Sequence, residues 1–213
     1  MSGLTMGVYE AVLGPVEFAK LAAPVREVFG PIARWTGRGL FQEVGAPNPL
    51  VRLALAPMVA DRALPGGFGR DVPFEVSSTL LIGADERLRQ WTVRTFSVEG
   101  TARSSVSVTV AERAGSDGAW VATDYLGQHE LISTAVAVTV EHGALTLTSS
   151  AARFRLGGRS VPIAGPLGAE AVTTHRWDEA RKQHHIDVEV RHPLLGDVLA
   201  YRGYFDVEVT PAG

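Results

Sequence analysis

The sequence has no cysteine among its 213 residues and only two lysines. The absence of cysteine excludes disulfide bonds, thiolate catalysis and zinc sites built on cysteine. The net charge of −3 is too small to give a concentrated basic face, which nucleic acids and anionic membrane surfaces both require. We therefore expect no nucleic-acid partner.

Long apolar runs are also missing. No segment reaches the roughly 18 uninterrupted apolar residues of a membrane span, and Arg52 and Pro57 interrupt the nearest candidate, PLVRLALAPMVADRA. The first residues lack a basic start followed by a continuous apolar core, because Glu10 and Glu17 interrupt the apolar runs there. We expect a cytoplasmic protein that does not span a membrane.

Common catalytic and cofactor motifs are the third absence. The sequence contains no G-x-S-x-G, no phosphate loop, no H-E-x-x-H and no G-x-G-x-x-G at a strand-to-helix junction. The usual hydrolase and nucleotide-binding classes are therefore disfavoured, and no cofactor is indicated. His184 and His185 are adjacent and would point to opposite faces of a strand, so solvated histidines are favoured over a metal site.

The pattern that is present has a period of two. From Val72 onward, runs rich in valine, threonine and aromatic residues alternate with Gly, Asp, Ser or Pro turns, which predicts nine or ten strands. Their short connections leave no room for crossover helices. We expect a mainly β fold: an antiparallel meander that closes into a β-barrel or a strongly curled sheet, within a single domain of residues 1–213.

Residues 1–70 predict a helical cap on this sheet of residues 71–210. Apolar residues between Leu13 and Phe29 recur every three or four positions, which predicts one helix or two helices broken around Pro24. A further short helix is expected between Leu50 and Ala63. The glycines and prolines of the intervening stretch, WTGRGLFQEVGAPNPL, are typical of turns.

The alternation also predicts which side chains face inward. Arg94 shares a face with Phe96, whereas Trp91 lies on the opposite face of the same strand. In residues 130–141, the face that begins with Glu130 and continues through Ile132 to Val140 is the more apolar one. A partly buried arginine needs a carboxylate or several acceptors, and Glu130 is the candidate partner of Arg94.

The stretch HPLLGDVLAYRGYFDVEV predicts a turn followed by a half-buried strand of the kind that closes a barrel. The same stretch, with RQWTVRTF and LPGGFGRDVPFEV, resembles the bacterial family called domain of unknown function 4166 across most of residues 25–209. The matching positions are His192, Pro193, Gly196, Tyr201 and Gly203, with Trp91 and Arg94 as a tryptophan and arginine pair. Members of that family occur alone or fused to dehydrogenase-like domains.

Arginine outnumbers lysine 18 to 2, as in proteins of high-GC bacteria, many of which make polyketides. The expected barrel is similar in general design to cofactor-free spirotetronate-type cyclases of polyketide pathways, in which an apolar cavity folds a polyene for cycloaddition. That similarity implies a hydrophobic small-molecule substrate and a [4+2]-type or related cyclisation in bacterial natural-product biosynthesis.

Three functional hypotheses follow. The first is a cofactor-independent cyclase, the second a non-catalytic lipid or metabolite carrier, and the third an interaction domain that partners a dehydrogenase-like enzyme. The sequence leaves enzyme activity, substrate and oligomeric state open. The candidate catalytic residues are Arg94, Tyr201 and Tyr125, and the candidate ligand-binding residues are Trp91, Phe96, Glu130 and His175.

Overall fold

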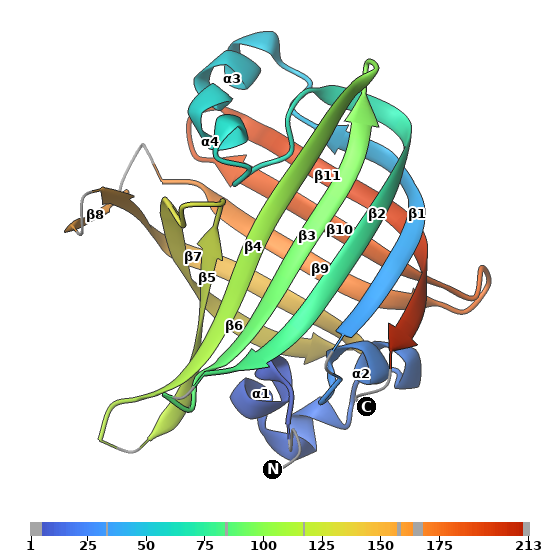
Figure 1. The fold of residues 1–213 in the computed structure, drawn as a ribbon, viewed down its shortest axis with the longest axis vertical. Coiled ribbons are helices and arrows are strands. Elements are labelled where there is room, and N and C mark those ends of the chain that lie inside the picture. Colours follow the sequence, from blue (N-terminus) through green and yellow to red (C-terminus); the bar gives the residue numbers. More distant parts are fainter. Residues whose placement is uncertain are drawn as a thin grey trace.

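The computed structural model describes residues 6–32, 34–83, 85–116, 118–156, 159–163 and 168–210. Ten described strands form a closed antiparallel barrel, and β8 pairs with β7 outside the ring (Figure 1). The strands are β1 (Arg34–Gly45), β2 (Phe68–Ile82), β3 (Leu88–Val98), β4 (Thr101–Ala114), β5 (Ala119–Leu126), β6 (Ile132–Glu141), β7 (Ala144–Leu156), β8 (Arg159–Pro162), β9 (Glu170–Asp178), β10 (Gln183–His192) and β11 (Gly196–Thr210).

The barrel is a continuous meander. Apart from the excursion through β8, each strand pairs with the next one along the chain, and β11 returns to pair with β1 from Arg34↔Thr210 to Gly45↔Ala200. This order removes the free sheet edges of the ring, because every barrel strand has two neighbours. The predicted mainly β meander, closed by its C-terminal strand, is confirmed.

The described part of the chain forms four short helices, which lie at the two ends of the barrel (Figure 1). α1 (Val8–Phe18) and α2 (Ala23–Phe29) are at one end, and α3 (Pro49–Ala54) and α4 (Ala56–Ala60) are at the other. Pro24 lies in the first turn of α2 rather than interrupting a helix, because the missing N–H of proline costs nothing there. No helix in the described ranges is long and apolar enough to cross a membrane.

Strand β1 differs from the sequence expectation, since it forms from residues that were expected to make turns within the helical cap. Gly37 and Gly39 lie on its inner face, next to Phe205 of β11. A Cβ atom on Gly39 would overlap the carbonyl oxygen of Tyr204 and the side chain of Phe205. These glycines therefore allow close packing inside the barrel, and part of residues 1–70 belongs to the sheet.

The barrel is filled on one side by aromatic rings. Phe41 stacks on Phe74 with ring centroids 3.8 Å apart, and its edge contacts Phe96 at 6.0 Å. Phe205 packs edge-on against Phe74 at 5.7 Å. All four rings are buried, and each aromatic side chain of this size contributes on the order of 2–3 kcal/mol through burial. This cluster is the centre of the hydrophobic core.

Candidate functional site

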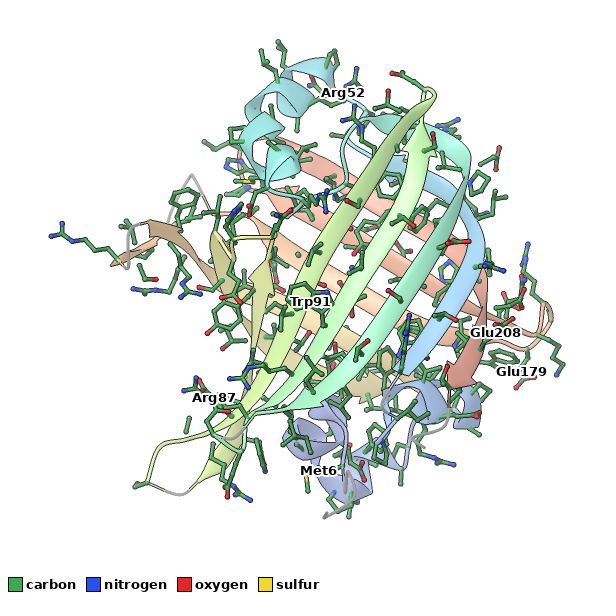
Figure 2. The ribbon with its side chains drawn as sticks, viewed as in Figure 1. Met6, Arg52, Arg87, Trp91, Glu179 and Glu208 are labelled. Atoms are coloured by element: carbon green, nitrogen blue, oxygen red, sulfur yellow. The ribbon has the colours of Figure 1, made fainter. Side chains whose placement is uncertain are left out.

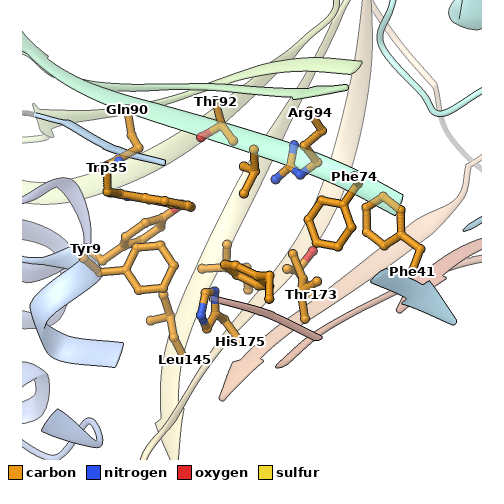
Figure 3. A pocket seen from close by; sticks show the side chains of 15 residues that line it. Tyr9, Trp35, Phe41, Phe74, Gln90, Thr92, Arg94, Leu145, Thr173 and His175 are labelled. Atoms are coloured by element: carbon orange, nitrogen blue, oxygen red, sulfur yellow. The ribbon is translucent and has the colours of Figure 1, made fainter. Parts of the chain in front are cut away.

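The barrel interior contains a small cavity near the end covered by α1 and α2. Its volume is about 60 Å³, which is less than the roughly 150 Å³ of an apolar cavity that holds benzene. Tyr9 of α1 and Phe29 of α2 reach in from the helices, and Trp35, Phe41 and Phe74 come from strands β1 and β2 (Figure 3). In this closed form the cavity admits only a very small molecule.

Arg94 is the charged side chain that lines this cavity (Figure 3). Its strand, β3, alternates between the two faces of the barrel wall, which places Arg94 on the inner face with Phe96. The guanidinium donates from Nη1 to Ser107 Oγ over 3.4 Å, and its carbon lies 5.7 Å from the centre of the Tyr201 ring. Among the described residues, no carboxylate oxygen lies within 4 Å of it. Arg94 therefore keeps donor capacity that no described protein group uses.

A row of polar side chains crosses the inner wall beside Arg94. Strand register places Gln90 of β3, Thr109 of β4, Asp124 of β5 and Thr134 of β6 opposite one another in turn. The Tyr9 hydroxyl and Thr109 Oγ1 are 3.2 Å apart and hydrogen-bonded. The polar row lies on β3 to β6, whereas the rings of the aromatic cluster come from β1, β2, β3 and β11, so the interior has a polar region and an aromatic region.

Asp124 is the acidic member of this row. Burial raises the pKa of its carboxyl group, while hydrogen bonding with Thr109 and the positive charge of Arg94 act in the opposite direction. Its Oδ1 atom is buried and has no hydrogen-bond partner in the described part of the chain, and the same is true of Thr134 Oγ1. A buried oxygen without a partner costs about 1–3 kcal/mol, so a hydrogen bond to either oxygen from water or a bound molecule would stabilise the folded protein.

Two histidines enter the interior from β9 and β10. His175 Nε2 and His184 Nδ1 are 3.0 Å apart, and His175 also lines the cavity. Burial is the main cause that lowers the pKa of both, to about 4 for His184 and well below the usual value for His175. Both rings are therefore neutral at pH 7. They supply hydrogen-bonding groups without adding charge next to Arg94.

The expectation of solvated histidines is wrong for the 175, 184 and 185 positions, which are 4%, 5% and 6% exposed. His184 and His185 do point to opposite faces, as expected. His184 stacks on Phe205 inside the barrel, whereas His185 packs against Tyr204 on the outside. Among the described residues, no group of three potential metal ligands comes together.

The structure brings four of the predicted site residues into the interior: Arg94, Phe96, Tyr201 and His175. Arg94 and His175 line the cavity itself. Tyr201 and Phe96 each contact the edge or face of Phe41, with centroids 5.7 Å and 6.0 Å away. Their inward direction follows from strand alternation, which the sequence already indicated.

The other three predicted site residues lie outside the interior. Trp91 is 39% exposed on the outer face of β3 (Figure 2). Tyr125 is also on the outer face, where the guanidinium of Arg155 lies 5.2 Å above its ring. Glu130 pairs with Arg155 over 2.9 Å and is not the partner of Arg94. Because side chains alternate between the two faces of a strand, Trp91 and Tyr125 lie on the face of the sheet opposite to Arg94.

Sequence reasoning missed Tyr9 and Asp124. Tyr9 lies in a helix, so strand alternation could not reveal that its ring enters the barrel. Asp124 alternates with Ala122, which is buried at 4% exposure, and this period-two signal was available in the strand AWVATDYL. An acidic residue at an inward position is the signal that could have found it.

Comparison with known proteins identifies relatives of this chain. A family model described as Domain of unknown function (DUF4166) matches residues 21–205. The "Uncharacterized protein YndH" of Bacillus subtilis (strain 168) is 26% identical over 176 residues, which cover 82% of this chain and 83% of YndH. Neither description names an activity.

Proposed function

We propose that this chain, which belongs to the family called Domain of unknown function (DUF4166), binds a small molecule in its barrel interior through Arg94. The observation that carries this proposal is the unpaired guanidinium at the cavity wall. Arg94 is partly exposed and has no carboxylate partner among the described residues, so its remaining N–H groups are available to an acceptor. A carbonyl or carboxylate oxygen in the cavity would supply that partner.

The polar and aromatic regions of the interior define the remaining chemistry of the ligand. Phe41, Phe74 and Phe205 provide apolar contact for its body, and Arg94 faces its polar end. Tyr9 and Phe29 line the cavity on the side of the helices, and its volume is about 60 Å³. A short-chain acid or ketone suits the closed form, and a larger ligand requires α1 and α2 to move outward.

The proposal is tested by isothermal titration calorimetry with straight-chain carboxylates of increasing length. We expect saturable binding that weakens sharply beyond the chain length that the cavity accepts, and a loss of at least tenfold in affinity for Arg94→Met. Arg38→Met is the matched control, because Arg38 is exposed on the outer wall and pairs with Glu75. No binding to the wild type, or equal losses in both variants, would refute the proposal.

Catalysis is the finer form of the same proposal. A cofactor-independent cyclisation would require the aromatic cluster to confine the substrate and Arg94 to polarise one of its carbonyl groups. Native mass spectrometry of the protein from its own host, followed by extraction, would identify a retained molecule. Incubation with that molecule separates the two forms, because an enzyme converts it and a carrier returns it unchanged.

The nearly filled interior favours a second candidate function. A cavity of about 60 Å³ is small beside the roughly 300–1,000 Å³ of sites for drug-sized ligands, as expected for an interaction domain that partners a dehydrogenase-like enzyme. Such a domain would bind no carboxylate, and co-purification from the native host would recover the partner enzyme.

A further inference from the structure

His175 and Arg94 line the same cavity, and each keeps hydrogen-bonding capacity that no described residue uses (Figure 3). His175 Nε2 and His184 Nδ1 are 3.0 Å apart and share one hydrogen. The other ring nitrogen of His175, Nδ1, makes no hydrogen bond with a described residue. The cavity is therefore lined by a guanidinium and by one ring of a hydrogen-bonded imidazole pair.

The cavity is small enough for one bound group to lie close to both side chains. Its volume is about 60 Å³, and a water molecule takes up roughly 30 Å³ in the liquid, so the space holds about two water-sized groups. A carboxylate is a group of this size. The positive charge of Arg94 already acts on His175 across the interior, so a charge placed between them acts on both.

The groups around the imidazole pair keep it neutral when no ligand is bound. Burial is the main cause that lowers the pKa of both rings, and the nearby positive charge of Arg94 lowers that of His175 further. The carboxylate of Asp206 acts in the opposite direction on His184, but it is exposed. Among the described residues, the interior carboxyl of Asp124 shifts neither ring. The titratable groups that face the pair are Tyr9 of α1, Arg94 of β3, His185 of β10 and Asp206 of β11.

A carboxylate bound by Arg94 reverses this balance. Its negative charge offsets the charge of the guanidinium and attracts a proton to the nearby imidazole. At a separation of about 5 Å, and at the effective dielectric constant of a protein interior, one such charge favours protonation by on the order of a hundredfold. A protonated His175 has an N–H at both ring nitrogens. One can donate to His184 while the other donates to the carboxylate.

We propose that a carboxylate enters the cavity together with one proton, which the His175–His184 pair holds while Arg94 binds the anion. This inference rests on the proposed function and narrows its ligand class to short carboxylic acids, with His175 as a second binding residue. The anion and the proton cancel in charge, so the net charge of the interior stays unchanged. Affinity for carboxylates then rises as the pH falls, by up to about tenfold for each pH unit.

The test is isothermal titration calorimetry of butyrate at pH 6 in two buffers that differ in ionisation enthalpy. The difference between the two heats gives the number of protons taken up with each ligand. We expect the wild type to take up about half a proton per butyrate at pH 6, and its affinity to rise several-fold from pH 7 to pH 5.5. Butyramide has nearly the same shape and offers Arg94 a carbonyl oxygen without a negative charge. It should bind without proton uptake.

Variants assign the proton to the imidazole pair. His175→Asn/His184→Asn should bind butyrate more weakly at pH 6 and take up no proton, whereas His142→Asn, which changes an exposed histidine, should match the wild type. NMR titration of the histidine rings in the wild type provides a measurement that does not depend on a variant. With butyrate, the two buried rings should become protonated at a higher pH than without it.

The possible failures separate this inference from the proposed function. Butyrate binding to the wild type without proton uptake, or uptake that persists in the folded double variant, overturns the inference and leaves the proposed function intact. Buried histidine rings that titrate identically with and without bound butyrate have the same meaning. Failure of both butyrate and butyramide to bind the wild type overturns the proposed function and this inference with it.

Discussion

The buried histidine pair predicts that acid destabilises the protein well above the pH at which exposed carboxylates become protonated. The pKa of His184 is about 4 in the folded protein, against an ordinary value of 6.5, and the pKa of His175 is also well below 6.5. The folded state therefore binds fewer protons than the unfolded chain between these values. Stability is fully present above about pH 6.5 and falls as the pH drops toward 4.

The magnitude follows from proton uptake by the unfolded chain. Between pH 7 and pH 5, an unfolded histidine of pKa 6.5 takes up most of a proton, while His184 in the folded state takes up almost none. The difference is about 2 kcal/mol for His184, and His175 acts in the same direction. Asp124 acts in the opposite direction, because its raised pKa lets the folded state bind a proton more readily.

The assay is urea unfolding at pH 7 and pH 5, followed by tryptophan fluorescence. The free energy of unfolding of the wild type should fall by about 2 kcal/mol or more between the two pH values. The double variant His175→Asn/His184→Asn should lose much less, whereas His142→Asn, which changes an exposed histidine, should behave like the wild type. An equal loss in the double variant and the wild type would refute the assignment of the effect to this pair.

Three further predictions concern packing around the cavity. Phe41→Ala should lower the free energy of unfolding by about 3–5 kcal/mol and enlarge the cavity, so urea unfolding with and without xenon checks both effects; a loss below 1 kcal/mol would contradict the buried stack. Gly39→Ala should destabilise the folded protein by about 1–3 kcal/mol through overpacking, and this loss should not depend on pH. Gly100→Ala is the control: a Cβ atom there meets no atom within 4 Å, so it should cost only about 1 kcal/mol through backbone strain. Thermal melts of both variants check the difference. Tyr9→Phe removes the hydroxyl that contacts Thr109 and should cost about 1 kcal/mol, and an unchanged melting temperature would argue against that hydrogen bond.

The sequence supported the mainly β fold because a period of two leaves few alternatives. Arg94 and Phe96 could be placed on one face from their spacing alone, and the barrel turns that face inward. β1 could not be recognised because Gly37 and Gly39 have low strand propensity. Their role depends on Phe205, which is distant in sequence and becomes a neighbour only when β1 and β11 pair.

The candidate site was less predictable because it depends on register between strands. Spacing within a strand gives the direction of Asp124 but not its position beside Thr134, which follows from pairing of β5 with β6. Glu130 was expected to compensate the charge of Arg94, yet a nearer surface arginine, Arg155, takes that carboxylate. The pattern within a strand predicts which face of the sheet a side chain lies on. Its contact partners on other strands can be identified only from the closed barrel.

The pairing of β1 with β11 has a consequence for how the protein folds. Arg34 pairs with Thr210, so the contact that closes the ring joins segments separated by nearly the whole barrel sequence. Contacts of such high sequence separation slow folding, because chain entropy is lost before they form. Until this seam forms, β1 and β11 expose unpaired backbone that can recruit a strand from another chain. Slow refolding and concentration-dependent aggregation during refolding are therefore expected from the same topology that leaves the finished ring without an edge.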